Sequence, residues 1–382
     1  MKKGTPEKKP VITSVRSDDA SYDVKLMFPV LFLVGIGIVM VYSTSSALAL
    51  KKFGSDYYFL KKQIVFSFLG IIALIACRHI PMKVIRSLTY PILILAVFSL
   101  VALKVTGFGY SANNATRWLR FGFINFQPSE FARLALIIYL AYSISKKKDD
   151  IKNFGIGFLP HFFVLCIFTV LILLQPDFGS IIIFWSITWI MLFVGGARIL
   201  HLLSPLIIGL PFFCFFIINS AYRLKRIISF LNPWQYSTDE GYQIIHSLMA
   251  FGTGGIWGTG IGKGYQKLFY LPEPHTDFIF SVIGEELGLC GVLIIIGLYT
   301  LILWVGISIA KNARDSFESF MAVGITCAIA IQVCINMGVT VGLLPTKGLA
   351  LPFLSYGGTS LLFSMASIGI LMNIGASGLK KT

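Results

Sequence analysis

The feature of this sequence that most constrains its fold is a succession of long apolar runs. The first run, residues 27–50, contains no charged side chain over more than twenty positions. A helix of roughly 20 residues crosses a hydrocarbon core about 30 Å thick. One such run could be a buried helix of a soluble domain, but a long series of them exceeds what a soluble core can bury. We therefore expect an all-α, polytopic integral membrane protein with about ten transmembrane helices.

The apolar runs also divide the chain into regions. A polar tail (1–25) precedes the membrane domain (26–376), and a short tail (377–382) follows it. The eighth run is long enough that it must either tilt or extend beyond the bilayer. A large loop, 222–277, separates the seventh and eighth spans. The expected spans lie near residues 26–47, 62–80, 86–106, 128–145, 156–175, 179–196, 203–221, 278–310, 318–340 and 358–376.

The composition argues against several other classes of protein. Only 13% of the 382 residues are charged, which is too few for the surface of a soluble domain. The net charge is +15, but the basic residues cluster between apolar runs, as in membrane loops, so we expect no nucleic-acid partner. The six cysteines form no C-x-x-C pair and the five histidines no H-E-x-x-H pattern, so we expect neither a disulfide framework nor a metal site.

The distribution of Lys and Arg predicts the orientation in the membrane. An even number of spans puts both termini on one side, and short basic segments such as 146–148 favour the cytoplasm for that side. The first apolar run is too long for the core of a cleaved signal peptide, so the N-terminal tail should be retained. The three unusual loops, 107–128, 222–277 and 341–357, then face outward. Binding and catalytic residues concentrate in such loops on a rigid scaffold.

The large loop contains two segments with a recognisable pattern. Residues 222–231 place Arg223 and Arg226 one turn apart, which favours a helix lying in the membrane interface over a continuation of the seventh span. Residues 252–264 are rich in glycine but fit neither G-x-x-x-x-G-K-[ST] nor G-x-G-x-x-G. Tight turns and close helix contact account for these glycines better than a nucleotide site does.

Asp277 is the strongest candidate for a functional residue, because it lies where the large loop enters the eighth span. A carboxylate there is costly unless it has a partner or a function. Alternatively, it could be an ordinary N-cap or first-turn acid of the eighth helix. Glu285 and Glu286 lie deeper, and a salt bridge to Lys or Arg of another segment is the favoured explanation for at least one of them.

The outer loops also carry three cations, Arg117, Lys267 and Lys347. These side chains could contact lipid headgroups, or they could hold an anionic group such as a pyrophosphate. Polar stripes on the ninth and tenth spans are more typical of helix–helix contacts than of substrate contacts. The stripes comprise Gln332, Asn336 and Thr340, and Ser360, Ser364 and Ser367.

Several of these segments form an ordered set of motifs, and this set resembles the SEDS family over nearly the whole chain. Segments 41–46 and 58–63 resemble the division type of this family more than the elongation type. Each motif is weak alone, but the ordered set is specific. The motifs lie at 113–119 and 127–130, 175–179, 232–234 and 241–243, 258–277, 284–286, and 344–358.

The resemblance implies a peptidoglycan glycosyltransferase that polymerises lipid II, a disaccharide-peptide on undecaprenyl pyrophosphate, at the outer face of the cytoplasmic (inner) membrane, at the division septum. Asp277 matches the essential aspartate of the family and is the expected catalytic residue. The family also implies a class B penicillin-binding (FtsI-like) partner among other division proteins. No cofactor is demanded, although a divalent cation (Mg or Mn) could assist. The expected substrate-binding residues are Arg117, Glu130, Lys267, His275, Glu286, Lys347 and Ser355.

The residues support a simple mechanism, with two rivals. Asp277 would take the proton of the acceptor hydroxyl, and Arg117 with Lys267 or Lys347 would stabilise the leaving pyrophosphate. A lipid II flippase or other transporter is the main rival, and discontinuous helices with charges at the membrane midplane would favour it. A catalytically silent division scaffold is the second. The polar motifs concentrate at one face, which favours the enzyme.

Overall fold

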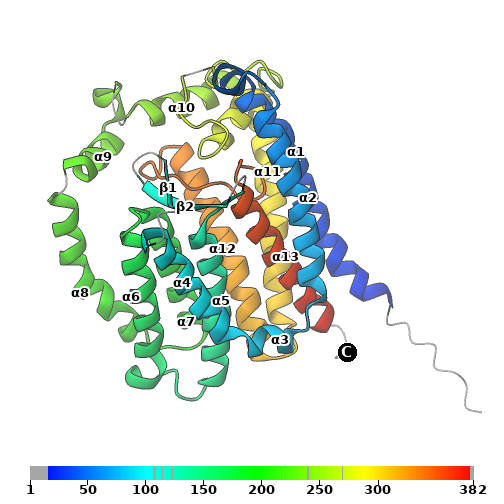
Figure 1. Ribbon diagram of the computed structural model, residues 1–382, viewed down its shortest axis with the longest axis vertical. Coiled ribbons are helices and arrows are strands. Elements are labelled where there is room, and N and C mark those ends of the chain that lie inside the picture. The colour runs from blue at the N-terminus through cyan, green and yellow to red at the C-terminus, as the bar shows by residue number, and fades with distance from the viewer. Residues whose placement is uncertain are drawn as a thin grey trace, which may run out of the picture.

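The computed structural model describes residues 16–105, 109–112, 115–121, 124–219, 221–238, 241–268 and 270–378. Most of the predicted N-terminal tail and the last four residues lie outside this range, as do Asn113 and Asn114. The described chain forms a bundle of long helices, which Figure 1 shows from the side.

A long helix coincides with each of the ten predicted spans, so the predicted all-α, multi-pass architecture is confirmed. Within the described residues, six helical segments are long and apolar enough to cross a membrane by length and composition, and further shorter apolar helices accompany them. The ten helices are α1 (Arg16–Phe53), α2 (Tyr58–His79), α4 (Thr89–Val105), α5 (Pro128–Lys146), α6 (Leu159–Leu173), α7 (Phe178–Val194), α8 (Ile199–Ile218), α11 (Ile279–Lys311), α12 (Ser316–Thr340) and α13 (Gly358–Gly378).

Shorter helices lie in the connections. Helix α8 ends at Ile218 and α9 begins at Ala221, so the amphipathic segment forms a helix of its own, as predicted, and does not continue the seventh span. Its position in the membrane interface stays a prediction. The short elements are α3 (Met82–Ser87), a π-helical turn η1 (Phe154–Phe158), α9 (Ala221–Leu231), a 3-10 turn η2 (Pro233–Tyr236) and α10 (Tyr242–Gly254).

The connection between α4 and α5 contains a small antiparallel sheet of order β1-β2-β3, where the sequence predicted only a loop. Main-chain donors and acceptors next to apolar helices must find partners, and hairpins supply them within the loop itself. The sheet therefore gives the connection between α4 and α5 a regular, hydrogen-bonded structure. Its strands are β1 (Gly109–Ala112), β2 (Ala115–Phe121) and β3 (Ile124–Phe126).

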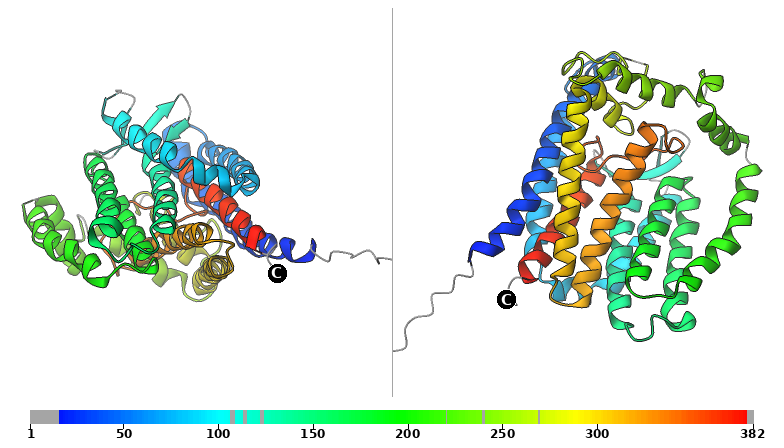
Figure 2. Two further views of the ribbon diagram at one scale, coloured as in Figure 1. Left: turned by 90° about the horizontal axis from the view of Figure 1, so that it is seen from below. Right: turned by 180° about the vertical axis from the view of Figure 1, so that it is seen from behind.

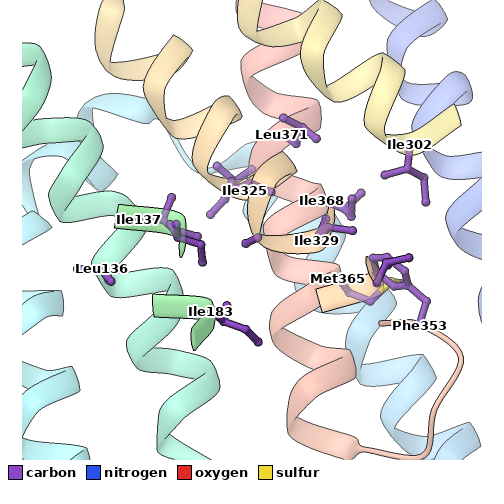
Figure 3. Close-up of a cluster of buried hydrophobic side chains, with 14 of the residues drawn as sticks. Leu136, Ile137, Ile183, Ile302, Ile325, Ile329, Phe353, Met365, Ile368 and Leu371 are labelled. Atoms are coloured by element: carbon purple, nitrogen blue, oxygen red, sulfur yellow. The ribbon is translucent and has the colours of Figure 1, made fainter. Parts of the chain in front are cut away.

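The core lies where α5, α7, α11, α12 and α13 meet, and Figure 3 shows part of its apolar side chains. Ile325 and Ile329 of α12 face Met365 and Ile368 of α13, and all four are nearly inaccessible. The loop after α12 turns back into the bundle and buries Phe353 beside these side chains. This loop is thus held by the core at its base.

The two ends of the bundle differ in character. Helix α1 begins and α13 ends at the same end of the bundle, whereas the sheet and helices α9 and α10 gather toward the other end (Figures 1 and 2). This arrangement agrees with the predicted even number of crossings. The large loop therefore lies at the end opposite the start of α1 and the end of α13.

The long eighth span is interrupted, not straight. Gly288 has φ 64° and ψ −164°, which breaks α11 after its first nine residues. The glycine-rich segment fills the break, because the Thr259 amide donates to the carbonyl of Glu285 (2.9 Å) and the Leu289 amide donates to the carbonyl of Gly255 (2.9 Å). A Cβ at Gly258 would lie only 2.2 Å from the Glu286 carbonyl oxygen, so the predicted close helix contact requires glycine there.

Candidate active site

Asp277 lies immediately before α11 but does not cap it. The N-cap position is Phe278, without a side-chain cap hydrogen bond. The aspartate is half-buried. Loss of water around the carboxyl and the nearby acids Glu273 and Asp177 raise the pKa of Asp277, Arg117 opposes the rise, and the net pKa is about 7. Asp277 therefore has the properties of a poised base and not those of a helix cap.

Arg117 comes from the sheet between α4 and α5. Tyr110 of β1 pairs with Trp118, and the next residue, Ser111, pairs with Thr116, so Arg117 is the unpaired residue of a β-bulge. Bulges of this kind re-aim side chains and are common beside active sites. The Arg117 Nη2 donates to the carbonyl of Pro176 (2.9 Å).

The guanidinium of Arg117 also lies beside a second acid. Its Nη2 is 3.8 Å from Asp177 Oδ1, and the arginine side chain keeps 24% of its surface exposed. Asp177 is buried and caps α7, because its Oδ1 accepts from the Ser180 amide (3.4 Å). The start of α7 thus orients Arg117 while leaving part of its donor surface open.

Asp277 and Arg117 meet at Gly348, in the loop after α12. A Cβ built on this glycine would lie 3.1 Å from Asp277 Oδ2 and 3.7 Å from Arg117 Nη1. The carboxyl and the guanidinium therefore face the same stretch of bare backbone. Lys347, the third predicted outer cation, is half-buried and directly precedes this glycine. The structure thus brings Asp277 and Arg117 close to Gly348, the residue that follows Lys347.

The main chain that carries Asp277 is fixed by three successive hydrogen bonds. The carbonyls of residues 275–277 each accept one bond from α12 or from the loop that follows it. Such bonding leaves the backbone before α11 little freedom, so the Asp277 carboxyl is held in one place. The bonds run from Tyr356 N to His275 O (2.9 Å), from Ser355 Oγ to Thr276 O (2.5 Å) and from Asn336 Nδ2 to Asp277 O (2.9 Å).

The structure places His275 and Ser355 in supporting positions. His275 is 5% exposed, and its ring packs on Phe59 with centroids 4.7 Å apart. Burial lowers the pKa of His275, with Glu273 acting in the opposite direction, so the imidazole is neutral at pH 7. Ser355 Oγ accepts from the Leu351 amide (2.8 Å) while it donates to Thr276. Both predicted substrate-binding residues therefore contact the protein itself.

Lys267 and Glu286 form a buried ion pair with each other. The Lys267 Nζ is 2.6 Å from Glu286 Oε1 and 2.8 Å from Ser43 Oγ of α1. Both side chains are at most 5% exposed. The Gly262 amide also donates to Glu286 (3.0 Å). This is the kind of salt bridge that the sequence predicted as the favoured explanation for at least one of the two glutamates, and it ties the glycine-rich segment to α11.

Glu130 is likewise engaged within the protein. In the first turn of α5 it pairs with Arg133 Nη2 (2.5 Å), and Arg133 Nη1 donates to Gln332 Oε1 (2.6 Å). Gln332 Nε2 donates in turn to the Ala350 carbonyl (2.8 Å). The polar stripe on α12 therefore does more than join helices, because it also anchors the loop that carries Gly348.

Sequence reasoning missed three residues at this place: Asp177, Gly348 and Asn336. A signal existed for Asp177, since it precedes an apolar span just as Asp277 does. The sequence indicated Asn336 only as part of the polar stripe on the ninth span, which is more typical of helix–helix contacts, and it indicated no role of its own for Gly348. The contacts of both residues depend on a loop that folds back between helices.

The fold and the site together define a class: a multi-pass helical membrane protein with an acid and a cation at the loop end of its bundle. The chain belongs to the FTSW_RODA_SPOVE family of cell cycle proteins, whose family model matches residues 24–378. This match confirms the SEDS resemblance.

Curated relatives and solved structures agree. The chain is 48% identical over 361 residues to the "Probable peptidoglycan glycosyltransferase FtsW" of Trichlorobacter lovleyi, covering 94% of each chain. It is 42% identical over 354 residues to "Stage V sporulation protein E" of Bacillus subtilis, covering 93% of this chain and 97% of the relative. The identities favour the division type.

Two solved structures share the fold. One, from "Structural coordination of polymerization and crosslinking by a peptidoglycan synthase complex", superposes with a TM-score of 0.75 at 26% identity, covering 93% of this chain and 98% of the other. The other is the Rod shape determining protein RodA of Thermus thermophilus, with a TM-score of 0.68 at 26% identity, covering 93% and 97%.

Proposed function

We propose that this protein is a peptidoglycan glycosyltransferase that polymerises lipid II at the outer face of the cytoplasmic membrane, for septal synthesis in cell division. The observation that carries the proposal is that Asp277, whose pKa is raised to about 7, and Arg117 both face Gly348. The names of the division-type relatives support the same activity.

The reaction transfers a sugar from a pyrophosphate to a hydroxyl. Asp277 takes the proton of the acceptor hydroxyl, whose oxygen forms the new bond to the anomeric carbon. The bond from that carbon to the pyrophosphate breaks, and the leaving group departs with the electron pair. A base of this kind contributes roughly 10²–10⁴-fold to the rate.

The leaving pyrophosphate needs neutralisation more than it needs a proton. Arg117 is assigned this role, because its guanidinium is oriented at the site and partly exposed. Lys347 is assigned as the second cation that neutralises the pyrophosphate, because it directly precedes Gly348. Lys267 receives no role in catalysis, because its ammonium is held by Glu286 and Ser43.

The undecaprenyl tail lies against apolar helix faces while the sugars occupy the loop end. A class B penicillin-binding protein supplies crosslinking. One solved structure with the same fold supports this assignment, because it is described as part of a peptidoglycan synthase complex. The break in α11 is of the kind that transporters use, but the glycine-rich segment occupies the hydrogen-bonding groups it frees. This favours the enzyme over the flippase.

The test is glycan formation from lipid II by the purified protein, with and without a class B penicillin-binding partner. Arms with a chelator and with added Mg²⁺ measure whether a divalent cation assists. A parallel vesicle assay scores lipid II translocation. Polymer without translocation is expected; translocation without polymer would replace the enzyme by a flippase, and neither activity would favour a scaffold.

A further inference from the structure

Asn336 of α12 joins the segment of Asp277 to the segment of Gly348. Its side-chain nitrogen donates to the carbonyl of Asp277 (2.9 Å) and to the carbonyl of Leu349 (2.7 Å). The residue is 2% exposed. Leu349 directly follows the glycine that the carboxyl and Arg117 face, so a single side chain fixes both backbones.

The hydrogen bonds explain why an asparagine stands here. Both partners are carbonyl acceptors, so the two N–H bonds of one amide nitrogen satisfy both. Serine or threonine would offer one donor and an ionised aspartate none. The Asn336 Oδ1 is buried and has no hydrogen-bond partner among the described residues. Leaving a buried acceptor unmatched is costly, so the two donor bonds are the feature that the site requires.

We propose that Asn336 is a positioning residue that keeps the Asp277 carboxyl at a fixed position relative to Gly348 and Arg117. The inference rests on the proposed function. It reaches beyond the catalytic pair, because Asn336 lies behind the site and touches the base only through its main chain. Without the amide, the two segments would still pack but would no longer be held at a fixed separation.

The test compares the isosteric variant Asn336→Leu with wild type in lipid II polymerisation. We expect kcat to fall on the order of 10²-fold, as for small misplacements of catalytic groups, with KM nearly unchanged. The acid limb of the pH–rate profile should also shift, because the pKa of Asp277 is set by burial, Glu273, Arg117 and Asp177, and each of these effects depends on where the carboxyl is held.

Thr340→Val is the matched control, since Thr340 lies one turn further along α12 and its hydroxyl donates only to the Met337 carbonyl of its own helix (2.8 Å). This variant should keep the wild-type rate and pH profile. If Asn336→Leu matches the control in both readouts, or loses only folded yield, the positioning role is wrong. A wild-type protein without polymerase activity would instead overturn the proposed function.

Discussion

At the scale of single residues, the chemistry depends on how strongly the site disfavours the charged form of Asp277. Loss of water and the neighbouring acids Glu273 and Asp177 raise the pKa of this carboxyl, and Arg117 lowers it, with a balance of about 7. A base with this pKa is half ionised near neutral pH, where proton transfer is most effective. The same balance makes the site sensitive to pH.

The pH–rate profile is therefore expected to rise through a pKa of about 7, because only the ionised Asp277 accepts a proton. Initial rates of glycan formation between about pH 5.5 and about pH 8.5 measure this. Replacing Arg117 by Gln should move the limb to higher pH. A profile that is flat down to about pH 5 would show that a different group is the base.

Folding stability should respond in the opposite direction. The folded state raises the pKa of Asp277 from 3.8 to about 7, so it binds the proton more tightly than the unfolded state does. Stability contributed at this position is therefore lost as pH rises from about 4 to about 7. Asp277→Asn should melt at a higher temperature than wild type at about pH 8 and at the same temperature near pH 4, as measured in detergent. A lower melting temperature at both pH values would contradict the assigned burial.

Gly348 is expected to be intolerant of any side chain. The Cβ of Gly348→Ala would lie 3.1 Å from Asp277 Oδ2, within the space that the acid and Arg117 share. The rate of glycan formation should fall by about tenfold or more with the fold intact. Gly357→Ala is the control, because its Cβ would meet only Ser360 Cβ at 3.6 Å. Equal rates for both variants would remove Gly348 from the site.

At the scale of elements, the ion pair of Lys267 and Glu286 anchors the glycine-rich segment to the first part of α11. Lys267→Met leaves Glu286 buried without its partner, which should destabilise the protein by about 3–5 kcal/mol. The double variant Lys267→Met/Glu286→Gln should recover most of this loss. Thermal unfolding in detergent measures both. A stable single variant would mean that the pair does not hold the segment.

The helices could be predicted from the sequence because their signal is local. Each predicted span is an apolar run, and each coincides with a helix. The break at Gly288 and the sheet around Arg117 could not be predicted from the sequence, because both depend on partners elsewhere in the chain. The same holds for the site: Asp277 was found from its position, whereas Asn336 acquires its role only when the loop after α12 folds back.

At the scale of the whole molecule, the account requires the candidate site and the termini to lie on opposite sides of the membrane. Single cysteines are introduced for Trp257, which is 82% exposed in the large loop, and for Lys148, which is exposed at the other end, in a background without native cysteines. An impermeant maleimide should label position 257 in intact cells and position 148 only after permeabilisation. The reverse pattern would place the site in the cytoplasm, away from the proposed substrate.

The central claim is that Asp277 is the base of a lipid II polymerase. Its most direct measurement is glycan formation from purified lipid II by wild type and by Asp277→Asn, at equal amounts of folded protein. The account predicts that the variant binds lipid II but loses on the order of 10²–10⁴-fold in rate. A variant that polymerises at the wild-type rate would contradict it.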